Sequence, residues 1–399
     1  MAVNEIKSDF PFFENNAECV YLDGAATSQK PKCVIAALTD FYNKCNSNIS
    51  RGEYPLADNA SRMFEAARER VASFFGASSD CVAFVQNATD ALNIAAETLG
   101  NGLSAGQNVV VSPLEHNSAL LPLMRICERT GAELRYIPLL DDGSPDIRAI
   151  WSVVDKNTAF ASFTAGSNVN GYRAPLEEVC AEFDRYGVQL IIDATQAAPH
   201  EKINVSNLKF DYMCLSAHKL YGPAGVGVII DGRGGKRTAV SRIGGGSVVE
   251  ADSHGYVLKS GLASIEAGTP NAAGVVAFGA AIDYISSLDL DSLWKNEMRL
   301  ADVLRRELKD MGAKVACGGE NPLPVVSFDP MFIHPLDAAR LLGAMGICVR
   351  SGRHCAHAAT KMLGLGSTLR VSLGIYNDDE DVSAFVSAMK KLKARYGNV

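Results

Sequence analysis

Short apolar runs recur through the middle of the chain, and most are followed by a segment with helical periodicity. Six of these runs are the expected strands: Val82–Val85, Val109–Ser112, Leu134–Pro138, Ala159–Phe163, Leu190–Asp193 and Tyr212–Leu215. Continuous apolar runs are typical of strands buried on both faces, and their alternation with helices favours parallel pairing. The pattern therefore predicts an α/β fold with a large, mostly parallel sheet covered by helices on both faces.

The sequence on either side of these strands follows other patterns. The further expected elements are a short strand and turn at 20–27, helices at 34–42, 59–75, 272–290 and 291–312, and an α+β portion with Pro324–Phe328, Asp337–Met345 and Thr368–Leu373. Glycine-rich pieces at 231–236 and 244–246 are expected to be loops. We expect a large domain at 21–280, a small C-terminal domain at 281–399, and an N-terminal arm at 1–20 that packs on the small domain.

Composition narrows the class of protein. Apolar residues make up 47% of the 399 residues and charged residues 21%, so a sizeable core can form. The net charge of −7 argues against a nucleic acid or an anionic membrane as a partner. No run reaches the roughly 18 apolar residues of a membrane span, and no secretory signal is recognised. The ten cysteines have no Cys-X-X-Cys motif and no regular spacing, unlike a disulfide scaffold or a zinc cluster. We therefore expect a metal-free enzyme of a reducing compartment, the cytoplasm.

One lysine lies between two apolar runs, in the stretch Ser216-Ala217-His218-Lys219-Leu220-Tyr221-Gly222-Pro223. Apolar surroundings would lower the pKa of Lys219, as an imine-forming amine requires; the alternative is a surface lysine in a turn. Upstream, an apolar strand ends at Asp193, a carboxylate placed to hold a protonated pyridine nitrogen. A strand-end aspartate with a Ser-X-His-Lys turn outlines a site for pyridoxal phosphate.

Two further strand ends carry polar residues that suit such a cofactor. Phe84–Asn93 runs from strand through a small polar turn to helix, so its helix start, with Ala88 and the Thr89 hydroxyl, can bind a phosphate. An ordinary N-cap is the alternative. His116 follows the next strand and can stack on a cofactor ring and exchange a proton with the substrate, although a lone histidine is often structural.

The C-terminal part holds a candidate nucleophile. Cys355 lies in Val349-Arg350-Ser351-Gly352-Arg353-His354-Cys355-Ala356-His357, beside two arginines and two histidines. Cationic neighbours and exposure favour the nucleophilic thiolate; the alternative is a surface cysteine among solvated charges. Arg370 is a charge within an apolar strand, and a substrate carboxylate would be a bidentate partner for it.

These residues together resemble the pyridoxal phosphate-dependent cysteine desulfurases, in particular the group II (SUF-type) branch that includes selenocysteine lyases. The resemblance spans nearly the whole chain. Its most specific pieces are Ser216–Pro223, Glu266-Ala267-Gly268-Thr269-Pro270-Asn271 and Arg350-Ser351-Gly352-Arg353-His354-Cys355-Ala356. It implies a homodimer of the aminotransferase-like fold type I and the conversion of L-cysteine to L-alanine. The sulfur would pass to a cysteine persulfide and then, through a possible acceptor protein, to iron–sulfur clusters or other sulfur compounds.

The resemblance also implies a role for each candidate residue. Lys219 would hold the cofactor covalently, Asp193 would hold its ring nitrogen, and His116 would stack on the ring. The remaining implied cofactor contacts are Gln196 and Asn168 near the ring hydroxyl, Ala88, Thr89, Ser216 and His218 at the phosphate, and Thr269 at the phosphate of the neighbouring subunit. Arg370, with Arg350 and Asn168, would bind the substrate, and Cys355 would take the sulfur.

The chain departs from the family pattern at two places. Ser50 and Tyr54 stand where the family often has histidines, and the phosphate turn Asn87-Ala88-Thr89-Asp90 has one hydroxyl fewer than usual. Two alternatives to a desulfurase remain open at this point. One is a selenocysteine lyase, or another β-lyase or epimerase of the same fold. The other is a catalytically silent scaffold that binds a sulfur-transfer partner through residues 350–357.

Overall fold

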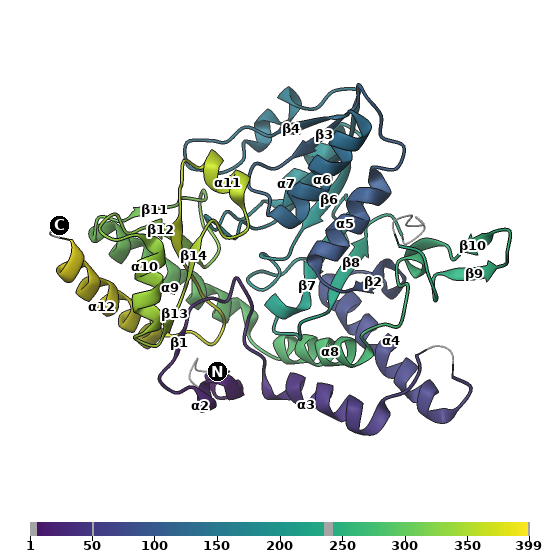
Figure 1. Cartoon of the computed structure of the whole chain (residues 1–399), viewed down its shortest axis with the longest axis horizontal. Helices are drawn as coiled ribbons and strands as arrows, with labels where there is room; N and C mark the ends of the chain where they lie inside the picture. Colours follow the sequence, from purple (N-terminus) through teal and green to yellow (C-terminus); the bar gives the residue numbers. More distant parts are fainter. Residues whose placement is uncertain (1–5, 50–51, 235–241, 398–399) are drawn as a thin grey trace.

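A seven-stranded sheet forms the centre of the computed structural model, which describes residues 6–49, 52–234 and 242–397 (Figure 1). The strand order is β2-β8-β7-β6-β5-β3-β4. The strands are β2 (Val82–Val85), β3 (Asn108–Val111), β4 (Glu133–Tyr136), β5 (Thr158–Thr164), β6 (Gln189–Asp193), β7 (Tyr212–Ser216) and β8 (Gly227–Asp231). The strands β4, β3, β5, β6 and β7 pair in parallel, whereas β8 is antiparallel to both β7 and β2. The expected α/β fold with a mostly parallel sheet is confirmed.

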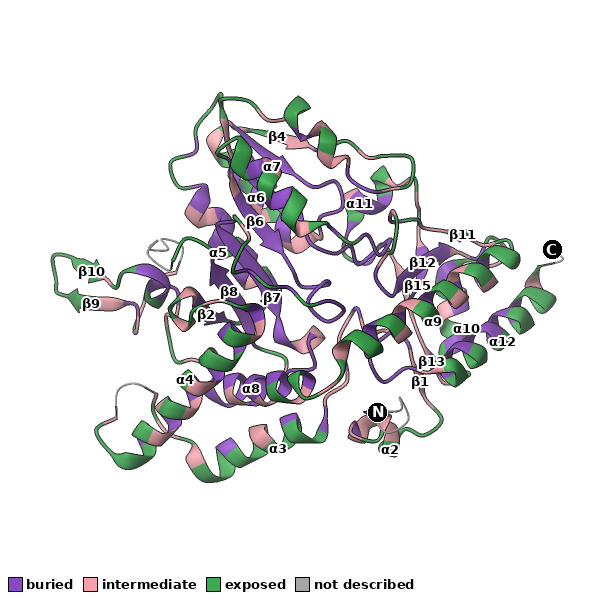
Figure 2. Ribbon diagram, turned by 180° about the vertical axis from the view of Figure 1, so that it is seen from behind, coloured by how far each residue is buried: buried purple, intermediate pink, exposed green. Residues whose placement is uncertain are grey.

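Side chains alternate along these strands between two separate cores. On β3, Val109 and Val111 belong to one core, and Val110 belongs to the other. Successive strand residues point to opposite faces, so a continuous apolar run buries both faces of the sheet, as Figure 2 shows in purple. The helices of the first core are α5 (Ala88–Leu99) and α6 (Asn117–Thr130), and those of the second include α4 (Pro55–Phe75), α7 (Leu176–Arg185) and α8 (Ala272–Ser286). In such sheets a ligand binds at the carboxyl ends of the parallel strands.

A second, four-stranded sheet has its own core. Its order is β11-β12-β15-β14, and its apolar side chains pack with three helices. Its elements are β11 (Lys314–Val315), β12 (Val325–Asp329), β14 (Arg350–Gly352), β15 (Thr368–Ser372), α9 (Leu290–Asp310), α10 (Pro335–Gly343) and α12 (Asp379–Tyr396). The domain division expected near residue 280 falls within α8. A short parallel ribbon, β1 (Val20–Tyr21) with β13 (Ile347–Cys348), joins the start of the chain to this part.

The N-terminal segment packs through aromatic rings and ion pairs. Phe10, just before α2 (Pro11–Asn15), is fully buried, and its ring centroid lies 5.1 Å from that of Tyr376 and 6.1 Å from that of Tyr221. Lys7 pairs with Asp381 of α12 at 2.9 Å. The segment thus contacts both the region after Lys219 and the end of the chain.

A hairpin that the sequence pattern did not predict follows the glycine-rich loop at 244–246. Strands β9 (Val248–Ala251) and β10 (Tyr256–Leu258) pair antiparallel and project from the body in Figure 1. The turn is fixed by Asp252, whose carboxylate accepts the N–H groups of His254 and Gly255 at 2.7 and 2.8 Å. Residues 50 and 51, and the last two residues of the glycine-rich piece at 231–236, lie outside the described residues, while Asp231 is the last residue of β8.

Helices in the described parts of the chain are too short or too polar to cross a membrane singly. The pair α8 and α9 meets the length and composition of a span only when taken together, with a bend of 85° between them.

Candidate active site

A cavity of about 320 Å³ lies at the carboxyl ends of the parallel strands, where helix starts and connecting turns converge. The candidate residues that line it are Ala88, Thr89, His116, Asn168, Asp193, Gln196, Ser216, His218, Lys219, Arg350 and Arg370. The small sheet contributes the last two, so the cavity is formed by both sheets. The structure thus brings together most of the residues selected from the sequence.

Lys219 ends a 3-10 turn, Ala217–Lys219, that follows β7 directly. Burial is the main cause that lowers the pKa of Lys219 to about 8; Asp193 opposes this shift, and the guanidinium groups of Arg370 and Arg350 contribute to it. A low dielectric disfavours the ammonium form. The amine is therefore available in its neutral, nucleophilic form at mildly alkaline pH.

Asp193 occupies the last position of β6, and 5% of its surface is exposed. Its Oδ1 accepts the N–H of Thr195 at 3.0 Å. Burial raises the pKa of Asp193, and Thr195 and Lys219 oppose that effect. Beside it, the side-chain oxygens of Gln196 (Oε1) and Thr195 (Oγ1) have no hydrogen-bond partner among the described residues. A buried carboxylate next to unused oxygens fits a flat ligand that carries a protonated ring nitrogen and a hydroxyl.

Another set of residues in the cavity lining suits an anion. Residues Asn87 to Thr89 begin α5, and the hydroxyl of Ser216 accepts the Ala88 N–H at 2.7 Å. The Thr89 hydroxyl lies 2.7 Å from that of Ser118. Gly227 lets the turn approach β8, because a Cβ there would lie 2.4 Å from the carbonyl carbon of Asn87. Hydroxyls and a helix start, together with Asp193 and Lys219 in the lining of the same cavity, fit pyridoxal phosphate.

His116 is the N-cap of α6, and its Nδ1 accepts the N–H of Ser118 at 3.1 Å. Burial lowers the pKa of His116 to about 3, with Lys219, Arg350 and Arg370 adding to the effect. The imidazole is therefore neutral near pH 7. A neutral, half-buried ring at the cavity wall can stack on an aromatic cofactor.

Arg370 lies in β15 and is fully buried. One Nη donates to Asp23 Oδ1 at 2.8 Å and the other to the carbonyl of Asn168 at 3.2 Å, while Nε has no partner among the described residues. Burial lowers the pKa of Arg370, although Asp23 opposes that change. An arginine with unused donor capacity at a cavity wall can bind a carboxylate.

The loop that carries Cys355 lies beside the cavity. Its thiol is exposed, and Arg350, which lines the cavity from β14, donates from Nη2 to Cys355 Sγ at 3.2 Å. His354 and Cys355 both have positive φ, 52° and 55°, a conformation that costs non-glycine residues about 1–2 kcal/mol each. Arg350 thus links the cavity to the exposed sulfur.

Thr269 lies apart from the other candidates. It lines a different cavity, of about 350 Å³, together with Glu266. Glu266 binds Arg68 at 2.6 Å and accepts the N–H of Phe84 at 2.7 Å, which fixes this segment against β2. Within one chain Thr269 is not brought to Lys219. Tyr54 is the exposed N-cap residue of α4.

Sequence analysis missed two charged residues near the site, the half-buried Lys30 and the buried Glu115. Lys30 Nζ donates to the carbonyl of His218 at 2.8 Å and also bonds the carbonyl of Ser28, and burial lowers its pKa to about 7. Glu115, next to His116, is buried with one oxygen on the Ser162 hydroxyl at 3.2 Å, and burial raises its pKa well above the usual range. Glu115 could have been noticed in the sequence, since it is a charge four residues after the end of the apolar strand β3. Lys30 gave no such signal, because its partner lies 188 residues away.

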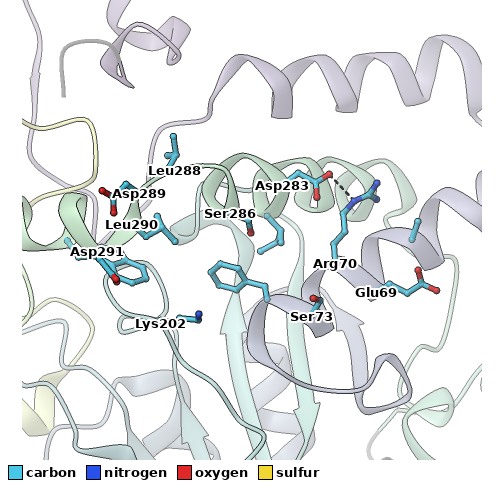
Figure 3. Close-up of a pocket in the computed structure, with 14 residues that line it drawn as sticks. Glu69, Arg70, Ser73, Lys202, Asp283, Ser286, Leu288, Asp289, Leu290 and Asp291 are labelled. Carbon is cyan, nitrogen blue, oxygen red and sulfur yellow. Dashed lines mark ion pairs between the residues drawn. The ribbon is translucent and has the colours of Figure 1, made fainter. Parts of the chain in front are cut away.

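A larger cavity, of about 780 Å³, lies between α4, α8 and the start of α9 (Figure 3). Arg70 and Asp283 form an ion pair of 2.8 Å across it. It holds none of the candidate residues, so we do not assign it to the chemistry. Among the described residues, no cluster of histidine, cysteine or carboxylate side chains is arranged to hold a metal ion.

A family model, two curated relatives and one solved structure each match this chain over most or all of its length. Residues 20–385 match the model of the aminotransferase class-V family. The chain is 35% identical to a probable cysteine desulfurase of Halalkalibacterium halodurans, with 100% of both chains aligned. It is 33% identical to a cysteine desulfurase of Cronobacter sakazakii, with 99% of both covered. The apo structure of a cysteine desulfurase from Thermococcus onnurineus NA1 superposes with a TM-score of 0.93 at 31% identity, covering 99% of this chain and 98% of the other.

Proposed function

This chain belongs to the aminotransferase class-V family, and we propose that it is a cysteine desulfurase whose sulfur-accepting nucleophile is Cys355. Similarity over the whole length to cysteine desulfurases supports this activity. The observation that carries the residue assignment is Arg350, which lines the cavity with Lys219 and also donates to Cys355 Sγ at 3.2 Å. Arg350 therefore connects the cavity that would hold the cofactor with the Cys355 thiol.

Members of this family depend on pyridoxal phosphate, and the cavity fits that group. Lys219 would hold it covalently, Asp193 would face its ring nitrogen, and the start of α5 with Ser216 would hold its phosphate. When bound, the cofactor supplies an electron-withdrawing ring that loosens the bonds around the substrate's α-carbon. Gln196 and Asn168 would complete the set near the ring hydroxyl.

The protein groups then have separable tasks. Arg370 would bind the substrate carboxylate, with Asp23 and the Asn168 carbonyl holding the guanidinium in place. Lys219, once neutral, would move a proton at Nζ. His116, neutral at physiological pH, would stack on the ring and accept or return a proton. Arg350 would stabilise negative charge on the Cys355 sulfur.

The net reaction transfers one sulfur atom. L-cysteine and the Cys355 thiol give L-alanine and a Cys355 persulfide: the Cβ–S bond of the substrate breaks, an S–S bond forms, and the departing sulfur is replaced by a proton. No external oxidant is needed. A reducing or acceptor thiol must then remove the outer sulfur, so we infer a separate sulfur acceptor.

The test is incubation of the purified protein with L-cysteine, followed by alanine measurement and location of the persulfide by peptide mass. Cys355→Ser should keep the yellow cofactor absorption yet lose alanine formation about 100-fold or more, because the covalent route is removed. Cys33→Ser, which removes another exposed thiol, serves as the control. Unchanged alanine formation by Cys355→Ser would refute the assignment.

The same assay separates the alternatives. Faster turnover of L-selenocysteine than of L-cysteine would indicate a lyase, and a protein with neither cofactor absorption nor alanine formation would be a scaffold. We also infer a homodimer, in which Thr269 reaches the cofactor phosphate of the neighbouring subunit. The dimer is tested by mass in solution, and Thr269→Ala by cofactor affinity.

A further inference from the structure

The backbone at His354 and Cys355 has a left-handed conformation that residues other than glycine rarely adopt. His354 and Cys355 have φ of 52° and 55° in succession, and neither is glycine. Positive φ persists in such residues only where the surroundings determine it. Contacts on both sides of the thiol must therefore hold this segment.

On the buried side, His354 supplies the anchor. Its carbonyl accepts from Asn168 Nδ2 at 2.7 Å, and its Nε2 lies 2.7 Å from the hydroxyl of Thr368 in β15. Asn168 and Thr368 are themselves buried. These contacts fix the residue before the thiol and leave the residues after it to be held from elsewhere.

On the other side, α6 holds the segment through one residue, Asn117. Its backbone N–H donates to the Cys355 carbonyl at 2.8 Å. Its side chain lies with Nδ2 3.1 Å from His357 Nδ1, and its Oδ1 accepts the His357 N–H at 3.4 Å. Asn117 and His357 are the first residues of α6 and of α11 (His357–Met362), so the clamp joins two helix starts.

The same helix end also fixes His116. The Ser118 N–H is satisfied by His116 Nδ1, and the Asn117 N–H by the Cys355 carbonyl. The first N–H groups of a helix have no partner within the helix, so a group that satisfies them is held in a defined place. The His116 imidazole and the Cys355 backbone are thus both held by the start of one helix, α6.

We propose that the Asn117–His357 pair is a positioning clamp, which keeps Cys355 Sγ against Arg350 and in register with His116. The inference deepens the proposed function and rests on it. Asparagine suits the role because one side chain both donates and accepts. Without the clamp the segment after the thiol loses two side-chain contacts, and Cys355 relaxes toward ordinary φ and away from Arg350.

The test compares Asn117→Ala and His357→Ala holoenzymes with wild type by two independent measurements. The first is the rate of iodoacetamide alkylation at Cys355 without substrate, read by peptide mass, with exposed Cys33 as the internal reference. We expect this rate to change at least threefold, since loss of a single hydrogen bond is worth up to about a factor of ten. The second is alanine formation, in which kcat should fall about tenfold with KM within about twofold.

Controls separate positioning from folding. His357→Gln keeps a side-chain amide that can meet Asn117 and should restore much of the wild-type behaviour. Lys361→Ala, an exposed position one turn along α11, should resemble wild type in both measurements. Unchanged alkylation of Cys355 in both alanine variants would overturn the clamp, even if kcat falls in those variants. If wild type makes no alanine, the proposed function fails, but the alkylation comparison still decides the clamp.

Discussion

Replacing Lys30 with methionine should change how the stability of the folded chain depends on pH. Lys30 is half-buried, its Nζ contacts carbonyl and hydroxyl oxygens of residues 27, 28 and 218, and burial lowers its pKa from 10.5 to about 7. In the unfolded chain the ammonium keeps its proton up to pH 10.5. Between the two pKa values the unfolded state binds more protons, so stability rises with pH across that window.

The magnitude follows from the two pKa values. At about 1.36 kcal/mol per pH unit, the difference between 10.5 and about 7 corresponds to ~5 kcal/mol of destabilisation, which is present in full below pH 7. About 2 kcal/mol of it remains at pH 9. Wild type should therefore gain ~3 kcal/mol relative to Lys30→Met between pH 6 and pH 9. Any loss of hydrogen bonds to His218 is independent of pH and cancels in this difference.

Urea unfolding followed by circular dichroism at several pH values measures this difference. The matched control is Lys202→Met, which removes an exposed lysine in place of the half-buried Lys30. If the curves for wild type and Lys30→Met stay parallel from pH 6 to pH 9, the ammonium of Lys30 is not desolvated in the way the structure implies.

Two further outcomes follow from the site. The neutral state of His116, whose pKa is lowered to about 3, should leave its ring NMR signals unchanged between about pH 5 and pH 8; a titration near pH 6.5 would contradict this. Arg370→Lys should raise KM for L-cysteine about 10- to 100-fold, because lysine keeps the charge but loses the paired N–H geometry. A KM equal to that of wild type would remove Arg370 from substrate binding.

The strands, and the meeting of Asp193 with Lys219, could be predicted because they depend on local patterns and one general rule. Apolar runs mark buried strands, and residues just after parallel strands gather at one edge of the sheet. The two residues lie at the ends of neighbouring strands, β6 and β7. Only 26 positions separate them in the sequence.

Long-range partners could not be predicted in this way. Asp23 pairs with Arg370 across 347 positions, and no periodicity in one segment specifies a partner in another. The contact between Asn117 and His357 spans 240 positions and depends on how two helix starts meet. The hairpin of β9 and β10 was missed because flanking glycines dominate its composition, while its turn depends on one aspartate side chain.

The burial of Phe10 also sets an order of events during synthesis. Its ring packs on Tyr221 and on Tyr376, so the segment around Phe10 cannot complete its packing until residue 376 has been made. At roughly 5–20 residues per second, the interval between Phe10 and Tyr376 is on the order of 20–70 s. For that time the Phe10 ring lacks one of its two aromatic partners, and its packing is completed only after Tyr376 has been made.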